Sequence, residues 1–486
     1  RFYIVEDELE LAAMLNAPLE KWRVFLHPSQ RKLVERSWNG PVRVLGGAGT
    51  GKTVAAIHRA KWLALNVFTN GNDRILFTTF TRNLAADIQD NLGKLCSREV
   101  LRRIEVVNLD RWVANFLKRI GYDHEIDYGG RTAQLWKQAV DMAPDELSLD
   151  PTFYREEWDR VIQPQGISSA EAYMKAGRVG RGIRLNRKTR KAVWTVFEEY
   201  RALLNEHGLR EPAGAMHDAR RLIESRNEFP LYRSIIVDEA QDMGMQAFKL
   251  LRKMVPEGEN DLFIVGDAHQ RIYRHKVVLG QCGINIMGRG KRLKINYRTT
   301  EETRSWAVSL LKRVAIDDLD GEADHQKGYK SLLHGADPMV HGFSTFDEEI
   351  DFIAQYLQEV RGEDGGLNGV CVVARTNDLL TQYGNALREK GFDTYPIKRS
   401  EAEDRNVPGV RLATMHRVKG LEFDRIVIAG ANAGIIPFEG PDCHSTDPTV
   451  RADAETGERS LLYVAATRAK KAVVVTAFGK PSRFLE

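Results

Sequence analysis

The sequence predicts an α/β protein built from two parallel-sheet domains, with a helical domain inserted into the first. Three observations carry this prediction. Short apolar runs end in glycine-rich or acidic turns, helix patterns alternate with those runs, and residues 109–228 show mainly helical periodicity. Alternating strand and helix patterns are typical of parallel sheets covered by helices. The expected parts are 1–108 and 229–285 for the first domain, 109–228 for the insert and 286–486 for the second domain.

The size and composition of the chain limit what it can be. A chain of 486 residues is too long for one compact core, so two to four domains are expected. Apolar residue types make up 43%, and no apolar run reaches the ~18 residues of a membrane span, so no membrane partner is expected. The formal charge of +4 is compatible with nucleic-acid binding but does not by itself argue for it.

The cysteines and the first residue add two expectations. The four cysteines lie far apart without a CxxC pair, which argues against a zinc or iron–sulfur site and favours a reducing cytoplasm. Because the chain begins at Arg1 rather than at a methionine, we expect a fragment or a processed form, with an upstream domain or an accessory protein as a further partner. A monomer is favoured, although no sequence feature fixes the oligomeric state.

The first strand-to-helix turn has the composition of a phosphate-binding loop. The run "VRVL" leads into G-G-A-G-T-G-K-T, which satisfies G-x-x-x-x-G-K-[ST], and a helical pattern follows. Glycines let backbone N–H groups surround phosphate oxygens, and the following helix N-terminus favours an anion. Lys52 would contact the β- and γ-phosphates of ATP, and the Thr53 hydroxyl would bind Mg²⁺. The expected nucleotide contacts in this loop are Gly46, Gly47, Ala48, Gly49, Thr50, Gly51, Lys52 and Thr53. A tight turn without a ligand is the alternative.

Two later strands end in side chains that ATP hydrolysis needs. In "YRSIIVDEAQDM", the apolar run 234–237 is followed by Asp238 and Glu239. Asp238 would hold the magnesium ion through water, and Glu239 would orient and deprotonate the attacking water. In "LFIVGDAHQRIY", Gln270 is placed to sense the γ-phosphate. Either turn could be a solvent-facing acidic or polar loop, but the phosphate-binding loop makes the catalytic interpretation stronger.

At this point the chain resembles the UvrD/Rep-like branch of superfamily 1 DNA helicases. Besides the phosphate loop, seven segments resemble that family's motifs in order: "LHPSQRKLV", "LFTTFTRNLAADI", "DEAQD", "VGDAHQRIY", "INYRTT", "MHRVKGLEFDRIVIAG" and "LLYVAATRAKK". The resemblance implies two RecA-like P-loop domains, an inserted helical domain of the 1B kind, and an ATP-hydrolysing motor that moves 3′→5′ on single-stranded or forked DNA.

The resemblance also assigns roles around the nucleotide. Gln30 would read adenine, Tyr297 would stack on it, and Glu422 would contact the nucleotide sugar or couple the cleft to the strand. Arg298 and Arg468, both in the second domain, would stabilise the charge of the transition state, a role that suits the forked, permanently charged guanidinium. ATP would then hold two domains together and its hydrolysis would release them. A surface ion pair for Arg298 and a core aromatic for Tyr297 are the plain alternatives.

Single strands are bound by aromatic stacking beside a positively charged track. The candidates after the early strands and around the third motif are Phe80, Arg82, Asn83, Asn108, Trp112, Tyr273, His275 and Lys276, and those of the second domain are Thr414, His416 and Arg417. Each aromatic could instead be core packing. Arg271 and Arg417 stand where the family has serines, and these two extra cations could hold backbone phosphate more firmly.

The insert contains a strongly basic segment. "RVGRGIRLNRKTRK", residues 178–191, carries seven basic residues and no acid, and Arg187, Lys188 and Arg190 are its candidate phosphate contacts. A solvated helix face or loop is the alternative. Only about 115 residues separate Arg298 from Thr414, which leaves no room for the extra 2B domain of the large family members. We therefore expect a compact member, whose translocation is better supported than its duplex unwinding.

Two other functions stay open from the residues alone. The same engine could act on RNA, because no motif here reads or excludes a 2′-hydroxyl. The chain could also be an ATP-gated nucleic-acid clamp without processive unwinding.

Overall fold

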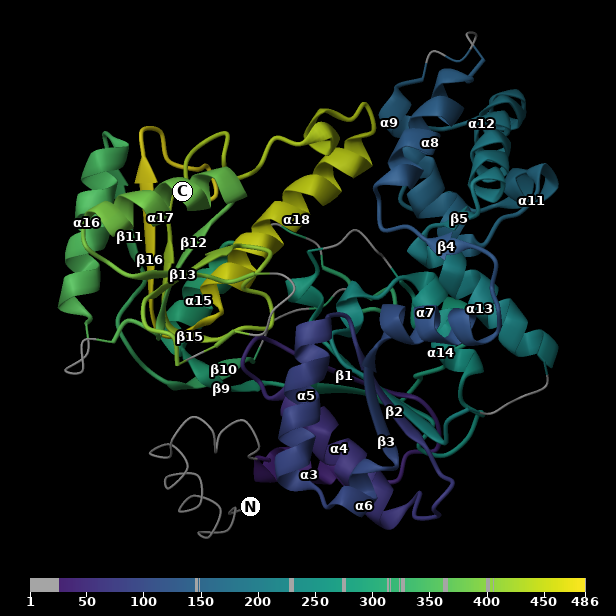
Figure 1. Ribbon diagram of the computed structural model, residues 1–486, viewed down its shortest axis with the longest axis horizontal. Helices are drawn as coiled ribbons and strands as arrows, with labels where there is room; N and C mark the ends of the chain where they lie inside the picture. Colours follow the sequence, from purple (N-terminus) through teal and green to yellow (C-terminus); the bar gives the residue numbers. More distant parts are fainter. Residues whose placement is uncertain are drawn as a thin grey trace.

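The computed structural model describes residues 26–485, except 145–146, 148, 227–230, 273–276, 313, 315, 323, 325–327, 362–365, 399–402 and 405. Two six-stranded sheets, each entirely parallel, form the two lobes seen in Figure 1, and a bundle of helices extends from the first lobe. This arrangement confirms the predicted fold class. Among the described residues, no helix is both long and apolar enough to cross a bilayer.

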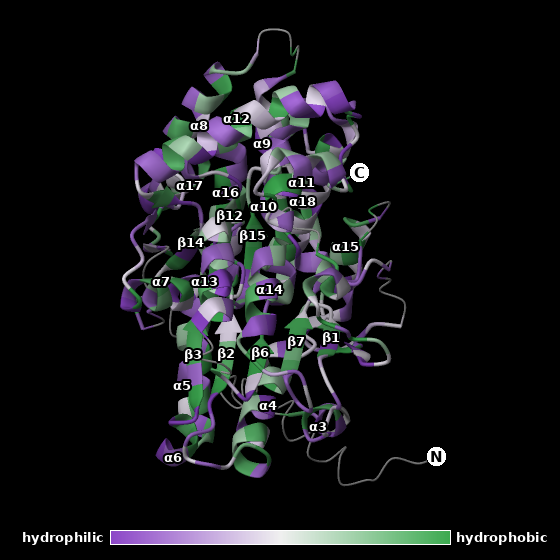
Figure 2. Ribbon diagram, turned by 90° about the vertical axis from the view of Figure 1, so that its right-hand side faces the viewer, coloured by the Kyte–Doolittle hydropathy of each residue, from purple (hydrophilic) through white to green (hydrophobic). Residues whose placement is uncertain are grey.

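The first sheet has the strand order β3-β2-β6-β7-β1-β8. Its strands are β1 (Val42–Gly46), β2 (Ile75–Thr79), β3 (Ile104–Asn108), β6 (Ser234–Val237), β7 (Leu262–Gly266) and β8 (Gly290–Leu293). Strands β3, β2, β6, β7 and β1 follow one another across Figure 2, where they are largely apolar in colour. Because β6 and β7, from after the insert, lie between β2 and β1, from before it, the sheet is complete only when both parts of the chain are present.

Side chains of the first sheet alternate between two cores. Leu76, Ile235 and Ile264 face a core built with α7 (Leu109–Arg119), α13 (Pro212–Arg226) and α14 (Met245–Lys253). Their neighbours face the opposite core, which is covered by α3 (Pro28–Val34), α4 (Lys52–Asn66), α5 (Arg82–Leu95) and α6 (Arg98–Leu101). Burial on both faces explains why these strands read as continuous apolar runs.

The helical insert is smaller than the sequence indicated. Its own core spans residues 135–209 and is built on α8 (Arg131–Asp141), α9 (Pro151–Glu157), α11 (Ala170–Lys175) and α12 (Arg187–Glu206), with the π-helical turn η1 (Trp158–Ile162) and the short α10 (Gln163–Gln165). The two-stranded pair of β4 (Glu125–Ile126) and β5 (Leu209–Arg210) closes its base. The helices α7 and α13, inside the predicted insert, instead cover the first sheet, because their apolar faces pack on that sheet.

The second sheet has the order β11-β16-β15-β12-β14-β13. Its strands are β11 (Met339–Phe343), β12 (Val370–Ala374), β13 (Thr394–Pro396), β14 (Val410–Thr414), β15 (Phe423–Ile428) and β16 (Ala469–Phe478). The helices α15 (Glu301–Ser309) and α18 (Pro448–Ala466) pack on one face, and α16 (Phe346–Glu359) and α17 (Asn377–Glu389) on the other. A separate pair, β9 (Ile295–Thr300) and β10 (Lys330–Leu333), links the domains.

The passage between the domains differs from the predicted boundary after residue 285. Strand β8 lies beyond that boundary, yet it pairs with β1, so that Val44 lies opposite Lys291 in the first sheet. The short helical turns η4 (Leu279–Cys282) and η5 (Pro441–His444) lie in connections. In the described part of the interval from Arg298 to Thr414, every helix and every strand except β10 belongs to the second sheet or to its covering helices.

Candidate functional site

The loop between β1 and α4 has a backbone that only glycine accepts at several places. Gly49 and Gly51 have φ values of 72° and 75°, in the left-handed region. A Cβ at Gly49 would come within 2.1 Å of the Asn296 side chain, and one at Gly46 within 2.3 Å of the Thr50 hydroxyl. The loop can therefore curl tightly at the carboxyl end of β1, with its N–H groups at the start of α4. This is the cradle that a triphosphate requires.

Lys52 lies inside this cradle. Its Nζ donates hydrogen bonds to the carbonyls of Gly46 (2.9 Å) and Gly47 (2.8 Å), and it lies 3.6 Å from Asp267 Oδ2. Burial alone would raise the pKa of Asp267. The charges of Lys52 and His269 outweigh that effect and lower the pKa to about 2. Asp267 is therefore ionised at neutral pH, and it helps to keep a charged amine at the place where phosphates would lie.

The Thr53 hydroxyl and the Asp238 carboxylate meet beside the loop. Thr53 Oγ1 donates to Asp238 Oδ2 at 2.7 Å. Burial, aided by the charge of the neighbouring Glu239, raises the pKa of Asp238 to about 7. A bound cation would lower this pKa, because it favours the ionised carboxylate. Mg²⁺ is usually held through one or two protein oxygens together with substrate phosphates and water. The two side chains fit such an ion.

Glu239 has a strained backbone. Its φ of 53° and ψ of 41° are in the left-handed region, which is costly for a residue with a side chain, typically about 1–3 kcal/mol. Gln241 Nε2 donates to the Glu239 carboxylate, and Gln241 Oε1 accepts from the backbone N–H of Asp267 (2.9 Å). Two neighbouring strand ends thus hold this carboxylate beside the phosphate loop, where a general base would act.

Arginines of the second domain reach the same cleft. Arg468 is 3% exposed, and its Nη2 donates to Gln270 Oε1 at 2.7 Å. Gln270 Nε2 in turn donates to Asp267 Oδ2 at 2.8 Å, so polar contacts run from Arg468 through Gln270 and Asp267 to Lys52. Burial, with the nearby charge of Arg298, lowers the pKa of Arg468 to about 10, which leaves it protonated at neutral pH.

Arg298 lies on the second-domain side of the cleft. Its Nη1 donates to Glu422 Oε1 at 2.8 Å and its Nη2 to the Thr467 carbonyl at 3.2 Å. The contact with Glu422 brings together two residues that are 124 positions apart. Arg298 and Arg468 are therefore both held at the end of α18.

Gln30 and Tyr297 both contact the phosphate loop. Gln30 Nε2 donates to the Thr50 carbonyl at 2.8 Å, and its Oε1 accepts from the His27 N–H at 3.2 Å. The Gln30 amide thus braces the loop, and its adenine-reading role stays a prediction. The Tyr297 N–H donates to the Gly49 carbonyl (3.0 Å), and its ring lies 4.8 Å from the His27 ring.

One cross-domain ion pair was not foreseen. Lys419, the lysine of the "KGLEF" segment, lies 2.5 Å from Asp242 Oδ2 and donates to the Gln270 carbonyl at 2.9 Å. Both side chains are at least nine-tenths buried. The segment's resemblance to a family motif was the available signal, but it did not identify the partner. Together with Arg468, Lys419 joins the second domain to the turn that carries Gln270.

The candidate strand contacts of the first domain fall into two groups. Phe80, Arg82 and Asn83 follow β2 at the carboxyl edge of the sheet, and all three are at least partly exposed. Asn108 and Trp112 are instead buried. The Trp112 indole donates to the Tyr232 hydroxyl at 2.7 Å and stacks on Phe116 within the core under α13. The prediction that Trp112 contacts a strand is therefore wrong for this conformation, because its ring is part of the core.

At the second sheet, Thr414 ends β14, His416 is exposed two residues later, and Arg417 is half-buried. A further aromatic at this edge was missed: Phe438 is 42% exposed, and the Arg375 guanidinium lies 4.8 Å from its ring centroid. Nothing in the spacing of the loop distinguished it from other phenylalanines. Tyr273, His275 and Lys276, with Arg274, lie outside the described residues.

Half of the basic segment of the insert points inward. Arg187 and Lys188 are exposed at the start of α12, as expected of phosphate contacts. Arg190 is not available in the same way: its Nη1 donates to the carbonyls of Tyr173, Met174 and Ala176 at the end of α11. Its assignment as a phosphate contact is corrected to that of a helix-capping cation. Arg271, a candidate extra cation, pairs with Asp317 at 2.5 Å.

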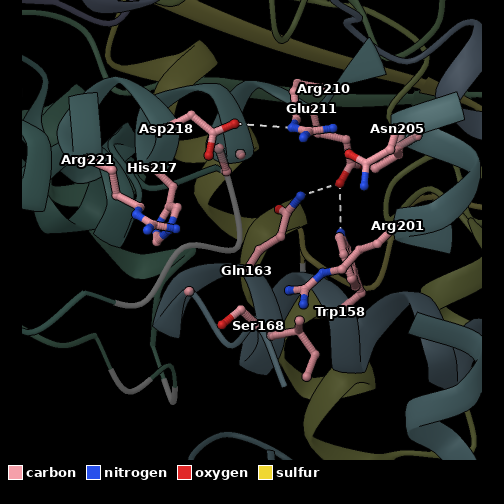
Figure 3. A pocket seen from close by; sticks show the side chains of 15 residues that line it. Trp158, Gln163, Ser168, Arg201, Asn205, Arg210, Glu211, His217, Asp218 and Arg221 are labelled. Carbon is pink, nitrogen blue, oxygen red and sulfur yellow. Dashed lines mark hydrogen bonds and ion pairs between the residues drawn. The ribbon is translucent and has the colours of Figure 1, made fainter. Parts of the chain in front are cut away.

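A cavity of about 340 Å³ lies away from the phosphate loop, where the insert joins the first domain. In Figure 3 its polar groups largely satisfy one another: Glu211 accepts from Trp158 and Gln163, and Arg210 donates to Asp218. None of the predicted site residues lines it. The chemistry of the molecule is therefore concentrated at the carboxyl edges of the two sheets.

Comparison with known proteins agrees with this geometry. Residues 26–277, more than half of the chain, match the family model of the UvrD/REP helicase N-terminal domain, and residues 396–480 match that of the UvrD-like helicase C-terminal domain. The chain is 23% identical to a probable DNA helicase of Mycoplasma pneumoniae, with 92% of this chain and 84% of that protein covered.

Two further relatives show the same similarity over different shares of their length. DNA helicase IV of Escherichia coli is 23% identical, with 95% of this chain and 69% of that protein covered. The ATP-dependent DNA helicase UvrD1 of Mycobacterium tuberculosis is 24% identical, with 76% of this chain and 49% of that protein covered. Because the family model of the UvrD/REP helicase N-terminal domain matches more than half of this chain, the chain belongs to the UvrD/REP helicase family.

Proposed function

We propose that this protein hydrolyses ATP between its two sheet domains and uses the resulting movement to travel along single-stranded DNA. The observation that carries the proposal is the run of polar contacts from Lys52 through Asp267 and Gln270 to Arg468, which joins the phosphate loop to the other domain. Family membership supports an ATP-driven DNA helicase activity.

The hydrolysis step assigns one role to each group. Lys52 and the loop N–H groups would bind the β- and γ-phosphates. Lys52 Nζ would then exchange its present contacts with the Gly46 and Gly47 carbonyls for contacts with phosphate oxygens. Glu239 would accept a proton from the water that attacks the γ-phosphorus, while ADP leaves with the bridging oxygen. Mg²⁺, when bound by Thr53 and Asp238, would neutralise charge on the phosphate oxygens. Arg298 and Arg468 would stabilise the transition state.

Opening of the cleft after hydrolysis would provide the movement. The γ-phosphate would be gripped from both domains, and its release would remove contacts that favour closure. Phe80 and Arg82 on the first domain, and Thr414, His416 and Phe438 on the second, lie at the sheet edges where each domain could hold part of a strand. Arg187 and Lys188 on the insert would add phosphate contacts. A 3′→5′ direction is proposed from family resemblance alone.

Strand separation is a weaker part of the proposal than translocation. The described helices and strands between β9 and β14, apart from β10, belong to the second sheet or its covering helices, which supports a compact member of the family. We therefore propose a motor that acts as a monomer in the cytoplasm and displaces short duplexes poorly unless an additional domain or an accessory protein assists it.

The test is the rate of ATP hydrolysis with Mg²⁺, measured alone and with single-stranded DNA or RNA of the same sequence. We expect strong stimulation by DNA and weaker stimulation by RNA. The Glu239→Gln variant should lose about 10²–10⁴-fold in kcat, because the general base is removed, while a fluorescent ATP analogue still binds. Glu257→Gln, an exposed glutamate of the same domain, is the matched control and should behave as wild type.

Three outcomes would count against the proposal. Equal turnover with and without nucleic acid would exclude a strand-driven motor. Stimulated turnover without displacement of a protein block bound to the strand would favour an ATP-gated clamp, and preference for RNA would redirect the motor to that substrate.

A further inference from the structure

The helical insert contacts the second domain at the N-terminal end of α18. The Gly182 N–H lies 3.1 Å from both carboxylate oxygens of Asp447, and Arg181 Nη1 lies 3.3 Å from Asp447 Oδ2. Two turns further along the helix, Arg160 Nη1 donates to Asp453. Figure 1 shows α18 running between the insert and the second sheet, with its N-terminal end beside α9. We call these five residues the latch.

The ion pair at the centre of the latch, Arg181 with Asp447, is buried. The side chains of Arg181 and Asp447 are 0% and 2% exposed. Glu157, also fully buried, orients Arg181 with a contact of 3.0 Å between Oε2 and Nε. Desolvated ion pairs with several hydrogen bonds are geometrically demanding, so a shift of either partner is costly. The insert and the start of α18 are therefore joined by a buried ion pair.

The other end of α18 holds the two arginines of the nucleotide cleft. Arg468 follows the helix directly after its C-cap residue Thr467, and its Nε donates to the Val464 carbonyl at 3.1 Å. Arg298 Nη2 donates to the Thr467 carbonyl at 3.2 Å. The helix has 19 residues, which corresponds to about 28 Å. A displacement of α18 would therefore carry both guanidinium groups with it.

We propose that Arg181, Gly182 and Asp447 are positioning residues for ATP hydrolysis: through α18, the latch sets the place of Arg468 in the cleft, so that the helical insert controls turnover. The inference rests on the proposed function, since it assumes that Arg468 acts on the γ-phosphate. The physical basis for this coupling is that one continuous helix, α18, is anchored at both ends. A strand held by Arg187 and Lys188 on the insert would then influence hydrolysis without touching the nucleotide.

Gly182 offers a way to disturb the latch without removing a charge. A Cβ at this position would come within 2.6 Å of Asp447 Oδ1, 3.1 Å of Thr449 Oγ1 and 3.2 Å of Pro448 Cδ. Gly182→Ala should therefore push α18 away from the insert. Asp447→Asn removes the ion pair with Arg181 and keeps a residue that caps the helix equally well. The milder Asp453→Asn acts at the second contact, where the side chain is 16% exposed.

The kinetic test compares these variants with Lys175→Ala, which removes an exposed cation from the same insert. We expect Gly182→Ala and Asp447→Asn to lower kcat with single-stranded DNA about tenfold, because a misplacement of about 1 Å can cost about 10²-fold and a smaller shift of Arg468 should cost less. KM for ATP should stay within about twofold, since the phosphate loop is untouched. Unchanged kcat in Gly182→Ala and Asp453→Asn would overturn the proposal, and so would equal losses in kcat and in nucleotide affinity.

A second measurement requires neither DNA nor hydrolysis. Hydrogen exchange of the amides in 178–183 is followed with and without a non-hydrolysable ATP analogue. The analogue should change exchange of these amides several-fold in the wild type and not in Asp447→Asn, while exchange in the insert core stays the same in both. No change in the wild type would contradict the coupling. If coupling is seen but DNA fails to stimulate turnover, the proposed motor function fails and the latch stands.

Discussion

The nucleotide cleft and the basic segment of the insert both gather buried charges, but they use them differently. In the cleft, Lys52 contacts two carbonyls and a carboxylate 3.6 Å away, so it can exchange these partners for phosphates. In the insert, Arg178 binds Glu157 through two nitrogens, and Arg181 binds the same carboxylate. The first arrangement can accept a ligand, whereas the second is already satisfied within the protein.

The difference shows that a basic residue indicates a ligand site only when the groups that it contacts in the folded protein are known. Seven basic residues in 14 positions suggested a nucleic-acid surface, yet Arg178, Arg181 and Arg190 are held by groups of the protein itself. One lysine in a glycine-rich turn was the better indicator, because the loop geometry fixes what surrounds it. Three experiments can break or sharpen this comparison.

The largest effect is expected in the cleft. Arg468→Ala should reduce kcat for ATP by about 10³-fold or more, because a forked cation that stabilises the transition state is lost, while binding of an ATP analogue is largely kept. Steady-state turnover and analogue titration measure the two quantities. Arg483→Ala, whose side chain is 61% exposed on the same domain, is the control. A loss below about tenfold would remove Arg468 from the catalytic group.

An intermediate effect is expected from the buried half of the basic segment. Arg181→Ala leaves Asp447 without its buried cation and leaves Glu157 with Arg178 as its remaining partner, so it should lower the free energy of unfolding by about 3–5 kcal/mol. Because the chain has several domains, the insert should be followed separately, by hydrogen exchange of its core amides in urea. Lys175→Ala, in an exposed ion pair, should change stability by less than about 0.5 kcal/mol. Equal effects would mean that burial does not distinguish these cations.

The smallest effect is expected from the exposed residues Arg187 and Lys188 of the basic segment. Arg187→Ala and Lys188→Ala should each reduce the slope of log affinity against log salt for single-stranded DNA by about 0.7, because each removes one phosphate contact. Arg190→Ala should leave the slope unchanged, since its guanidinium already binds three carbonyls. Fluorescence anisotropy between low and moderate salt measures all three. A slope that falls only in Arg190→Ala would reverse the assignment of the segment.

The fold class and the parallel order of strands could be predicted because strand-end motifs are local. Gly46–Thr53, Asp238 and Gln270 each lie within a few residues of the strand that positions them, so spacing alone places them at one sheet edge. The limits of the insert were less predictable: α7 and α13 have the helical pattern of their neighbours, and only contact with the first sheet assigns them to it. Likewise, β8 is short and half polar, which hides it as a strand.

The latch and the burial of Trp112 could not be predicted from local pattern. Asp447 lies 265 positions from Gly182, and Tyr232 lies 120 positions from Trp112. The sequence pattern around an aromatic residue is the same whether its ring stacks on a nucleic-acid base or packs against a helix. Such roles depend on which distant segment supplies the partner, and the sequence carries no spacing rule for that.

The interleaved first sheet has a consequence for how the protein is made. Strand β1, which carries the phosphate loop, lies between β7 and β8, which leave the ribosome only after the whole insert has been synthesised. At about 5–20 residues per second, the nascent chain waits on the order of 10–50 s between these strands. During that time the backbone N–H and C=O groups at both edges of β1 lack their partner strands, and such edges can pair with other chains. ATP can therefore stabilise this domain only late in synthesis, once β8 has emerged.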